Sequence, residues 1–152
     1  MEQEKQKTGE ELAAKIMEYA RDELMISMRF LDRALFRMPL VAADSVAAFG
    51  VDGATMYYNP EYVLHAFKRE KNACTRAFLH MILHCIFSHP FQYEKLDREC
   101  WDLATDLAVE QSILDLNLKC VELERDASLK RTLSHLAQKV PILTAEKIYR
   151  WL

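Results

Sequence analysis

Hydrophobic residues recur at helical spacing along the first quarter of the chain, between Thr8 and Pro39. Thr8 and Glu11 have the spacing of a capping box, and proline cannot continue a helix. The pattern therefore predicts one long helix over residues 9–38. Its apolar positions are Leu12, Ile16, Tyr19, Ala20, Leu24, Met28, Leu31 and Leu35.

The next segment changes to short β-prone runs. Residues 46–50 and 55–59 lie on either side of Asp52-Gly53, and Asp-Gly is a strong signal for a β-hairpin. A two-stranded ribbon is expected here. Asn59 and Pro60 then begin a short helix to about residue 68, with proline in its favoured first position.

The rest of the chain is again helical in pattern, and three glycines and four prolines offer few turns. The helix over residues 72–89 is apolar nearly all round, so it should lie at the centre of the fold. The sequence predicts a single mainly α domain of the α+β class over residues 1–152. Its further helices are expected at about residues 72–89, 97–116, 127–139 and 145–152, the last with Thr144 as its cap.

Composition narrows the class of protein. A chain of 152 residues with 51% hydrophobic and 28% charged residues suits one globular domain. The formal net charge of −3 argues against a nucleic-acid binder, which needs a concentrated basic surface. The longest near-apolar stretch, residues 77–87, is far shorter than the ~20 residues that span a bilayer, so no membrane partner is expected.

The N-terminal residues and the cysteines both favour a cytoplasmic protein. The polar, mixed-charge N-terminus does not have the features of a secretion signal. The four cysteines are Cys74, Cys85, Cys100 and Cys120, and they form no CxxC pair. We therefore expect buried free thiols and not disulfides.

The central apolar helix carries the candidate chemistry, because His80, His84 and His89 interrupt it. Residues four apart on a helix are separated by about 40° of rotation and one turn of rise, so His80 and His84 can bind one ion. A catalytic zinc ion takes three protein ligands and keeps one open position. Asp106 on the following helix is the strongest candidate for the third ligand, and His89 is a further candidate.

That following helix bears Asp102, Asp106 and Glu110 at every fourth position. If it packs antiparallel on the histidine helix, through the short connection at residues 91–96, this acidic face can point at the imidazoles. The alternative is a solvated acidic stripe with no function at the site.

Met81 follows the first histidine, where a zinc-peptidase helix has a glutamate that takes a proton from the metal-bound water. A thioether is only a weak hydrogen-bond acceptor and cannot do this at neutral pH. Its apolar bulk should also dry the site.

Residues 44–116 resemble the bacterial putative metallopeptidase domain that commonly precedes a von Willebrand factor A-like domain. The shared features are a hairpin that ends in Tyr-Tyr-Asn-Pro at residues 57–60, paired histidines four apart followed by a further histidine, and a motif that begins at Trp101 and ends at Asp106. The resemblance implies a zincin-like fold with His80 and His84 as the paired zinc ligands. His89 and Asp106 correspond to the family's additional histidine and aspartate.

Three positions depart from the family pattern. Met81 replaces the general base, Asp102 replaces an asparagine, and Glu110 stands where a polar amide is expected. Each departure weakens the inference of peptidase activity, while none affects the inference of the fold.

Three hypotheses about function follow. The leading one is a degenerate, catalytically silent domain that acts as a binding or scaffold module for a protein or peptide, such as a von Willebrand factor A-like domain, and that could retain or have lost its zinc. The second is an active zinc peptidase in which Glu110 or Asp102 is a substitute base. The third is a metal-free structural module.

Overall fold

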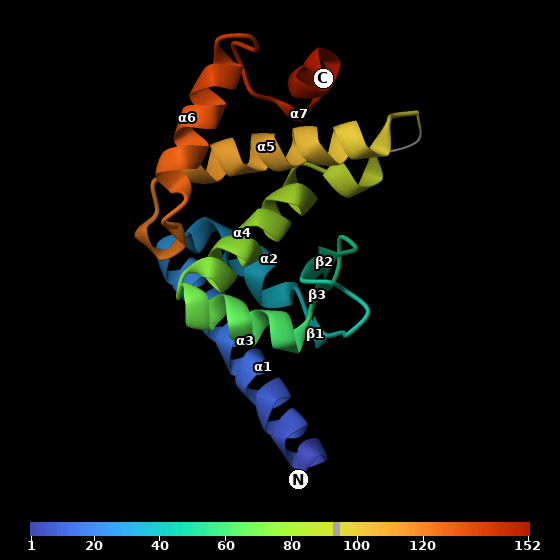
Figure 1. Cartoon of the computed structure of the whole chain (residues 1–152), viewed down its shortest axis with the longest axis vertical. Helices are drawn as coiled ribbons and strands as arrows, with labels where there is room; N and C mark the ends of the chain where they lie inside the picture. The colour runs from blue at the N-terminus through green and yellow to red at the C-terminus, as the bar shows by residue number, and fades with distance from the viewer. Residues whose placement is uncertain (93–94) are drawn as a thin grey trace.

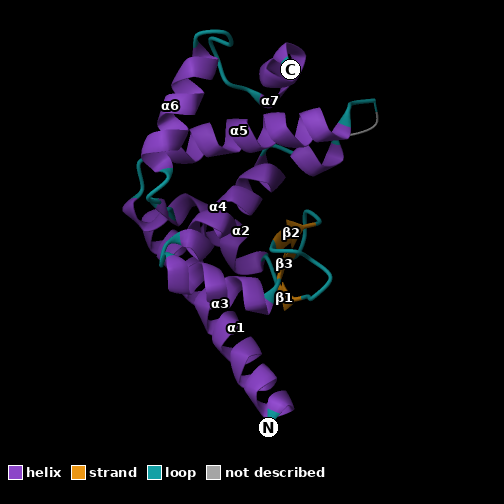
Figure 2. Ribbon diagram, in the orientation of Figure 1, coloured by secondary structure: helices purple, strands orange, loops and turns teal. Residues whose placement is uncertain are grey.

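The computed structural model describes residues 1–92 and 95–152. Helices dominate it, and a small three-stranded sheet lies to one side (Figures 1 and 2). The predicted fold class, α+β and mainly α, is confirmed. Among the described residues, no helix combines the length and apolar character needed to cross a bilayer.

The long first helix is shorter at its C-terminal end than its periodicity predicts. α1 (Glu2–Ser27) ends at Met28, and the chain continues as a 3-10 turn (Arg29–Leu31) and α2 (Asp32–Arg37). Met28 and Leu35, on either side of the 3-10 turn, both lie in the core. The capping-box prediction is wrong, since α1 begins before Thr8, whose hydroxyl donates to a carbonyl one turn back at 2.8 Å.

The sheet contains the predicted hairpin and one more strand. β2 (Phe49–Val51) and β3 (Met56–Tyr58) pair antiparallel, and Gly53 in the turn between them has a φ of 93°. β1 (Leu40–Ala42) pairs parallel with β3, which gives the order β1-β3-β2. β1 was not predicted, because three residues after a proline carry too little pattern to indicate a strand.

The central helix is bounded by two local signals. α3 (Pro60–Arg69) precedes it, and its N-cap Asn59 accepts a hydrogen bond from the Tyr62 backbone at 3.1 Å, as the Asn-Pro motif predicts. α4 (Ala73–Ile86) then ends three residues before the predicted position, because Ser88 adopts a left-handed conformation with a φ of 58°. His89 therefore belongs to a 3-10 turn, η2 (His89–Phe91), and not to α4.

α5 (Arg98–Leu116) returns across α4 (Figure 1), although residues 93 and 94 of the expected connection lie outside the described part. The Asp97 carboxylate caps it by accepting from the Cys100 backbone at 2.9 Å. The 3-10 turn η3 (Lys119–Val121), α6 (Asp126–Ala137) and α7 (Ala145–Trp151) complete the chain. Thr144 is at the N-cap of α7, but its side chain makes no capping hydrogen bond.

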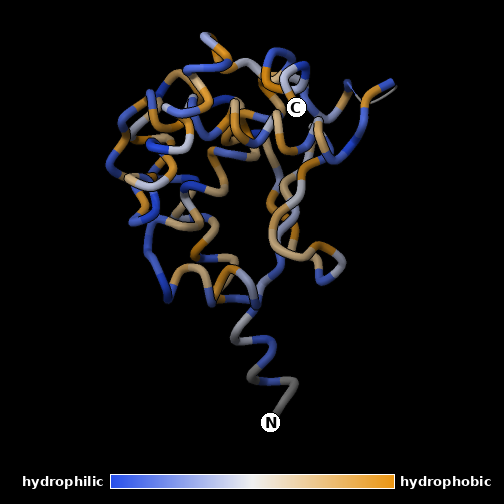
Figure 3. Tube along the Cα trace, turned by 45° about the horizontal axis from the view of Figure 1, so that its top comes forward, coloured by the Kyte–Doolittle hydropathy of each residue, from blue (hydrophilic) through white to orange (hydrophobic). Residues whose placement is uncertain are grey.

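Two apolar clusters lie on different sides of α5. The larger joins α1, α3, α4 and the sheet, and it includes Val109 and Ile113 of α5. The smaller forms around Trp101 between α5 and α7. In Figure 3 hydrophobic and hydrophilic segments alternate along the helices in the body of the molecule. α5 is therefore held on two sides, which leaves its remaining face free to carry polar groups toward α4.

The cysteines are free, as predicted, but only one of them is buried. Cys74 lies in the core, and burial raises the pKa of its thiol to about 11. Cys85, Cys100 and Cys120 are partly exposed.

Candidate metal centre

Three side chains converge where α5 crosses α4. The Nε2 atoms of His80 and His84 are 2.9 Å apart. Oδ1 of Asp106 lies 3.3 Å from Nε2 of His80 and 3.1 Å from Nε2 of His84. The helical spacing of the histidines and the crossing of α5 thus bring together the three residues that sequence analysis placed first as ligands.

The donor set fits a zinc ion. Two ligand atoms bound tetrahedrally at the usual zinc distances are about 3.3 Å apart, and the three observed separations, 2.9 to 3.3 Å, are close to this value. Two imidazoles and one carboxylate are also a usual ligand set for a zinc ion with an open position. The His80 and His84 side chains are 15% and 12% exposed, whereas that of Asp106 is 58% exposed, so the group opens to solvent on the Asp106 side.

Behind His80, a buried carboxylate determines how the ring is turned. Oε1 of Glu110 lies 2.8 Å from Nδ1 of His80, and its Oε2 accepts from Arg76 at 2.6 Å. Arg125 also approaches Oε2, at 3.5 Å. A carboxylate at Nδ1 holds the proton on that nitrogen and leaves Nε2 as the ligand atom. Glu110 therefore orients His80 through the ring nitrogen that faces away from the three-atom group.

Behind His84 the partner is a second imidazole. Nδ1 of His89 lies 3.2 Å from Nδ1 of His84, and the His89 backbone carbonyl accepts from the Trp101 indole at 3.4 Å. His89 is thus next to the ring nitrogen of His84 that faces away from Asp106. The structure places it outside the three-atom group, in a position to orient His84.

The electrostatics of the two backing groups differ. Burial raises the pKa of Glu110, but the bonds from His80 and the Arg76 guanidinium outweigh it and bring the pKa to about 2. Burial, together with the neighbouring His84, lowers the pKa of His89 to about 4. At neutral pH Glu110 is therefore an anion, while His89 is neutral and can accept the Nδ1 proton of His84.

His80 and Asp106 stabilise each other's charged form. Burial lowers the pKa of His80, but the bonds and charges of Asp106 and Glu110 outweigh it, so the pKa of His80 is raised. Burial raises the pKa of Asp106, yet the bonds to both histidines hold it well below its usual range. In the metal-free protein the two carboxylates therefore favour the protonated form of His80.

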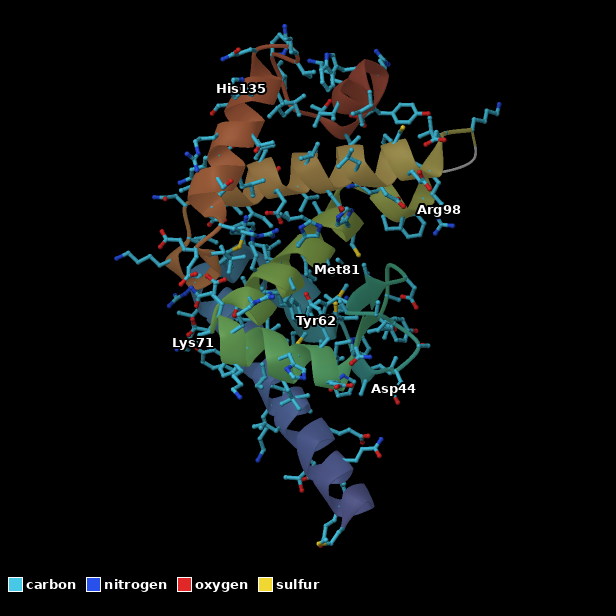
Figure 4. All side chains as sticks on the ribbon, in the orientation of Figure 1. Asp44, Tyr62, Lys71, Met81, Arg98 and His135 are labelled. Atoms are coloured by element: carbon cyan, nitrogen blue, oxygen red, sulfur yellow. The ribbon has the colours of Figure 1, made fainter. Side chains whose placement is uncertain are left out.

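Met81 and Asp102 do not belong to the three-atom group. Met81 is half-buried and packs against the core cluster, and it lies on α4 near the centre of the molecule (Figure 4). Asp102 is exposed and pairs with Arg98 one turn earlier on α5, at 3.9 Å, so it points away from the site. Of the three acids predicted to face the imidazoles, only Asp106 and Glu110 do so.

A groove of about 910 Å³ runs beside the three-atom group. His80, Met81 and Asp106 contribute to one part of its wall, and the segment that connects α5 to α6 contributes another. Most of the other lining side chains are apolar, including Phe49, Tyr62, Leu107, Leu123 and Leu129. The open side of the candidate metal centre thus faces a space large enough for a ligand.

Arg76 was not predicted to contribute to the site, although its position in the sequence carries a signal. The residue interrupts the apolar run of α4 one turn before His80, and an arginine in such a run must find a buried partner.

Two other histidines play no part in the site. His65 is exposed beside Glu61 at 3.8 Å, and His135 lies far away on α6 (Figure 4).

Comparison with known proteins identifies a family. A family model described as a putative metallopeptidase domain matches residues 14–152. The match extends on both sides of residues 44–116, where the sequence motifs lie, and it includes most of α1 together with α6 and α7. No curated protein and no solved structure matches the chain.

Proposed function

The chain belongs to the putative metallopeptidase domain family, and we propose that it holds a zinc ion on His80, His84 and Asp106 without hydrolysing peptides. The observation that carries the proposal is the convergence of three ligand atoms beside a position where a thioether replaces the expected acid. Bound zinc would supply a Lewis acid with one open coordination position toward the groove.

The absence of a suitable base supports the non-hydrolytic part of this proposal. A positioned general base is typically worth about 10²–10⁴-fold in rate, and Met81 cannot supply it. Glu110 is a poor substitute, because its oxygens are engaged by His80 and Arg76 and its pKa is about 2. Asp102 is directed toward Arg98. Asp106 would itself be a ligand.

The groove supports a binding role. Its volume, about 910 Å³, is in the upper part of the range for ligand sites, and its largely apolar lining suits side chains of a peptide or protein segment. We therefore propose a metal-bearing binding module. A von Willebrand factor A-like domain, which commonly follows this kind of domain, is a candidate partner.

Metal content tests the first part of the proposal. Protein purified without chelator is expected to contain one zinc ion per chain by elemental analysis, and His84→Ala is expected to lose it. His135→Ala is the matched control, because this exposed histidine lies on α6. A wild-type protein without zinc at micromolar zinc concentrations would overturn the proposal in favour of a metal-free structural module.

Hydrolysis of a mixed peptide library tests the second part. Zinc-loaded wild type is expected to cleave nothing above background, whereas Met81→Glu restores an acid at this position and is expected to gain activity. Met81→Gln is the control for size and polarity. If wild type cleaves peptides, and Glu110→Gln or Asp102→Asn at equal zinc occupancy does not, the domain is an enzyme with a substitute base.

A further inference from the structure

Arg76 is a buried charge whose partners lead to the candidate metal centre. Its side chain is 3% exposed, and it donates to Oε2 of Glu110 at 2.6 Å. Another guanidinium nitrogen donates to the Val121 carbonyl at 2.9 Å and to Oδ2 of Asp126 at 3.3 Å. One side chain on α4 thus holds α5 and the segment that leads into α6.

Stability alone does not account for this arrangement. A buried ion pair contributes little more than well-packed apolar residues of the same volume, because both charges lose their hydration. Here Nε of Arg76 and Oδ1 of Asp126 are also buried with no hydrogen-bond partner among the described residues. We therefore expect the network to fix the positions of its side chains more than to increase the stability of the fold.

The geometry that it sets is that of His80. Arg76 precedes His80 by one helical turn, so both side chains lie on the same face of α4. Both contact Glu110, Arg76 at Oε2 and His80 at Oε1. Because the carboxylate is planar, holding one oxygen determines where the other one points.

We propose that Arg76 is a positioning residue for the metal centre. It directs Glu110 at Nδ1 of His80, which places the proton on Nδ1 and presents Nε2 to the metal. The same guanidinium also couples metal binding to the packing of residues 121–126, of which residues 123–125 line part of the groove. The inference rests on the proposed zinc site for its metal-dependent part, whereas the orientation of His80 is a property of the metal-free protein as well.

Residues 121–126 have a second link to the same network. The backbone amide of Leu123 donates to Oδ2 of Asp126 at 3.0 Å, the oxygen that Arg76 also contacts. Arg125 approaches Glu110 from the groove side at 3.5 Å. A change at Glu110 is therefore transmitted to this segment through two arginines.

The first measurement is the tautomer of His80, read by nitrogen-15 NMR of the metal-free protein at a pH where the ring is neutral. Wild type is expected to carry the proton on Nδ1, and Arg76→Met is expected to shift the population toward Nε2. Arg69→Met is the control, because Arg69 is an exposed arginine that lines the same groove. A wild-type tautomer in folded Arg76→Met would overturn the inference.

The second measurement is zinc affinity by chelator competition. Loss of a partner behind a metal ligand typically weakens binding by about 10–100-fold, which is expected for Arg76→Met and Glu110→Gln. Arg76→Lys keeps the charge without the planar fork and is expected to lie between wild type and Arg76→Met. It also serves if Arg76→Met does not fold. Unchanged affinity in both Arg76 variants would overturn the inference.

The third measurement is hydrogen exchange of the amides in residues 121–126. Zinc is expected to slow exchange there in wild type and not in Arg76→Lys, and equal protection in both would contradict the coupling. These results separate two failures. A wild type that binds no zinc defeats the proposed function, while the tautomer measurement on the metal-free protein still decides the role of Arg76.

Discussion

The two imidazoles of the candidate metal centre are held from behind in different ways. The His80 arm consists of His80, Glu110 and Arg76, and it ends in a buried ion pair. The His84 arm consists of His84, His89 and Trp101, and it ends in a neutral ring and an indole. The same ligand type, four residues apart on one helix, thus receives an anionic partner in one case and a neutral partner in the other.

The difference indicates which arm controls the site. A hydrogen bond to a carboxylate is about twice as strong as one between neutral groups, so the tautomer of His80 is held more firmly than that of His84. The partner of His84 also lies on a 3-10 turn after α4, whereas that of His80 lies within α5. The His80 arm should therefore be the more sensitive to substitution.

The largest expected effect is on folding. Glu110→Leu removes one partner of a buried ion pair and leaves Arg76 with Asp126, so the free energy of unfolding should fall by about 3–5 kcal/mol. His89→Leu removes a neutral hydrogen bond and should cost about 1–3 kcal/mol. Urea denaturation of the metal-free proteins measures both. Equal losses would remove the distinction between the arms.

The pH dependence of zinc binding sharpens the comparison. Zinc requires Nε2 of His80 without its proton, and the pKa of His80 is raised, so affinity should begin to fall at a higher pH than for an ordinary histidine. Each displaced proton contributes about 10-fold per pH unit. Asp106 and Glu110 both raise this pKa, and Glu110→Gln removes one of these two charges, so the onset should move to lower pH in calorimetric titrations. In His89→Gln the onset should not move.

Below pH 6.5, the two arms should affect the free energy of unfolding over different pH ranges. The pKa of His89 is lowered from 6.5 to about 4. Its contribution to the free energy of unfolding is therefore fully present above pH 6.5 and is lost as the pH falls toward 4. The pKa of Glu110 is lowered from 4.5 to about 2, so its contribution is lost between pH 4.5 and 2. His80, with a raised pKa, contributes below pH 6.5 and loses that contribution as the pH rises.

Stability measured against pH tests this assignment. His89→Gln should flatten the slope between pH 6.5 and 4, and Glu110→Gln should flatten it below pH 4.5. Each slope is at most about 1.4 kcal/mol per pH unit. A slope that persists in both variants would assign acid sensitivity to other groups.

The smallest effect is expected outside both arms. Asp102 is exposed and pairs with Arg98 at 3.9 Å, and an ion pair on the surface contributes little to the free energy of unfolding. Asp102→Asn should change the free energy of unfolding by less than about 0.5 kcal/mol and leave zinc affinity unchanged. A large loss of zinc in this variant would mean that the acid face of α5 is turned differently toward α4.

The three converging residues were predictable because each lies at a regular position on its own helix and the two helices follow one another closely in the chain. His80 and His84 share a face by helical spacing alone, and Asp106 is on a helix that had to return across α4 after a short connection. The hairpin and the Asn59 cap were likewise predicted from local turn chemistry. These features need no knowledge of distant residues.

The features that were missed or misplaced depend on distant residues. The break after Ser27 has no proline or glycine near it to indicate it, and β1 exists because β3 is available to pair with it. Glu110 was assigned to the acidic face but not to its role, since that role requires Arg76 and His80 on another helix.

The order of residues by itself determined a mainly helical domain with a paired-histidine helix, an acidic neighbour and no glutamate at position 81, because period and residue type are local properties. Only the tertiary structure decided which acid meets which ring nitrogen, that His89 lies behind His84, and that a buried arginine connects the site to residues 121–126. The reason is physical. A side chain's partner on another helix depends on how the two helices cross, and that crossing is the outcome of packing the whole core.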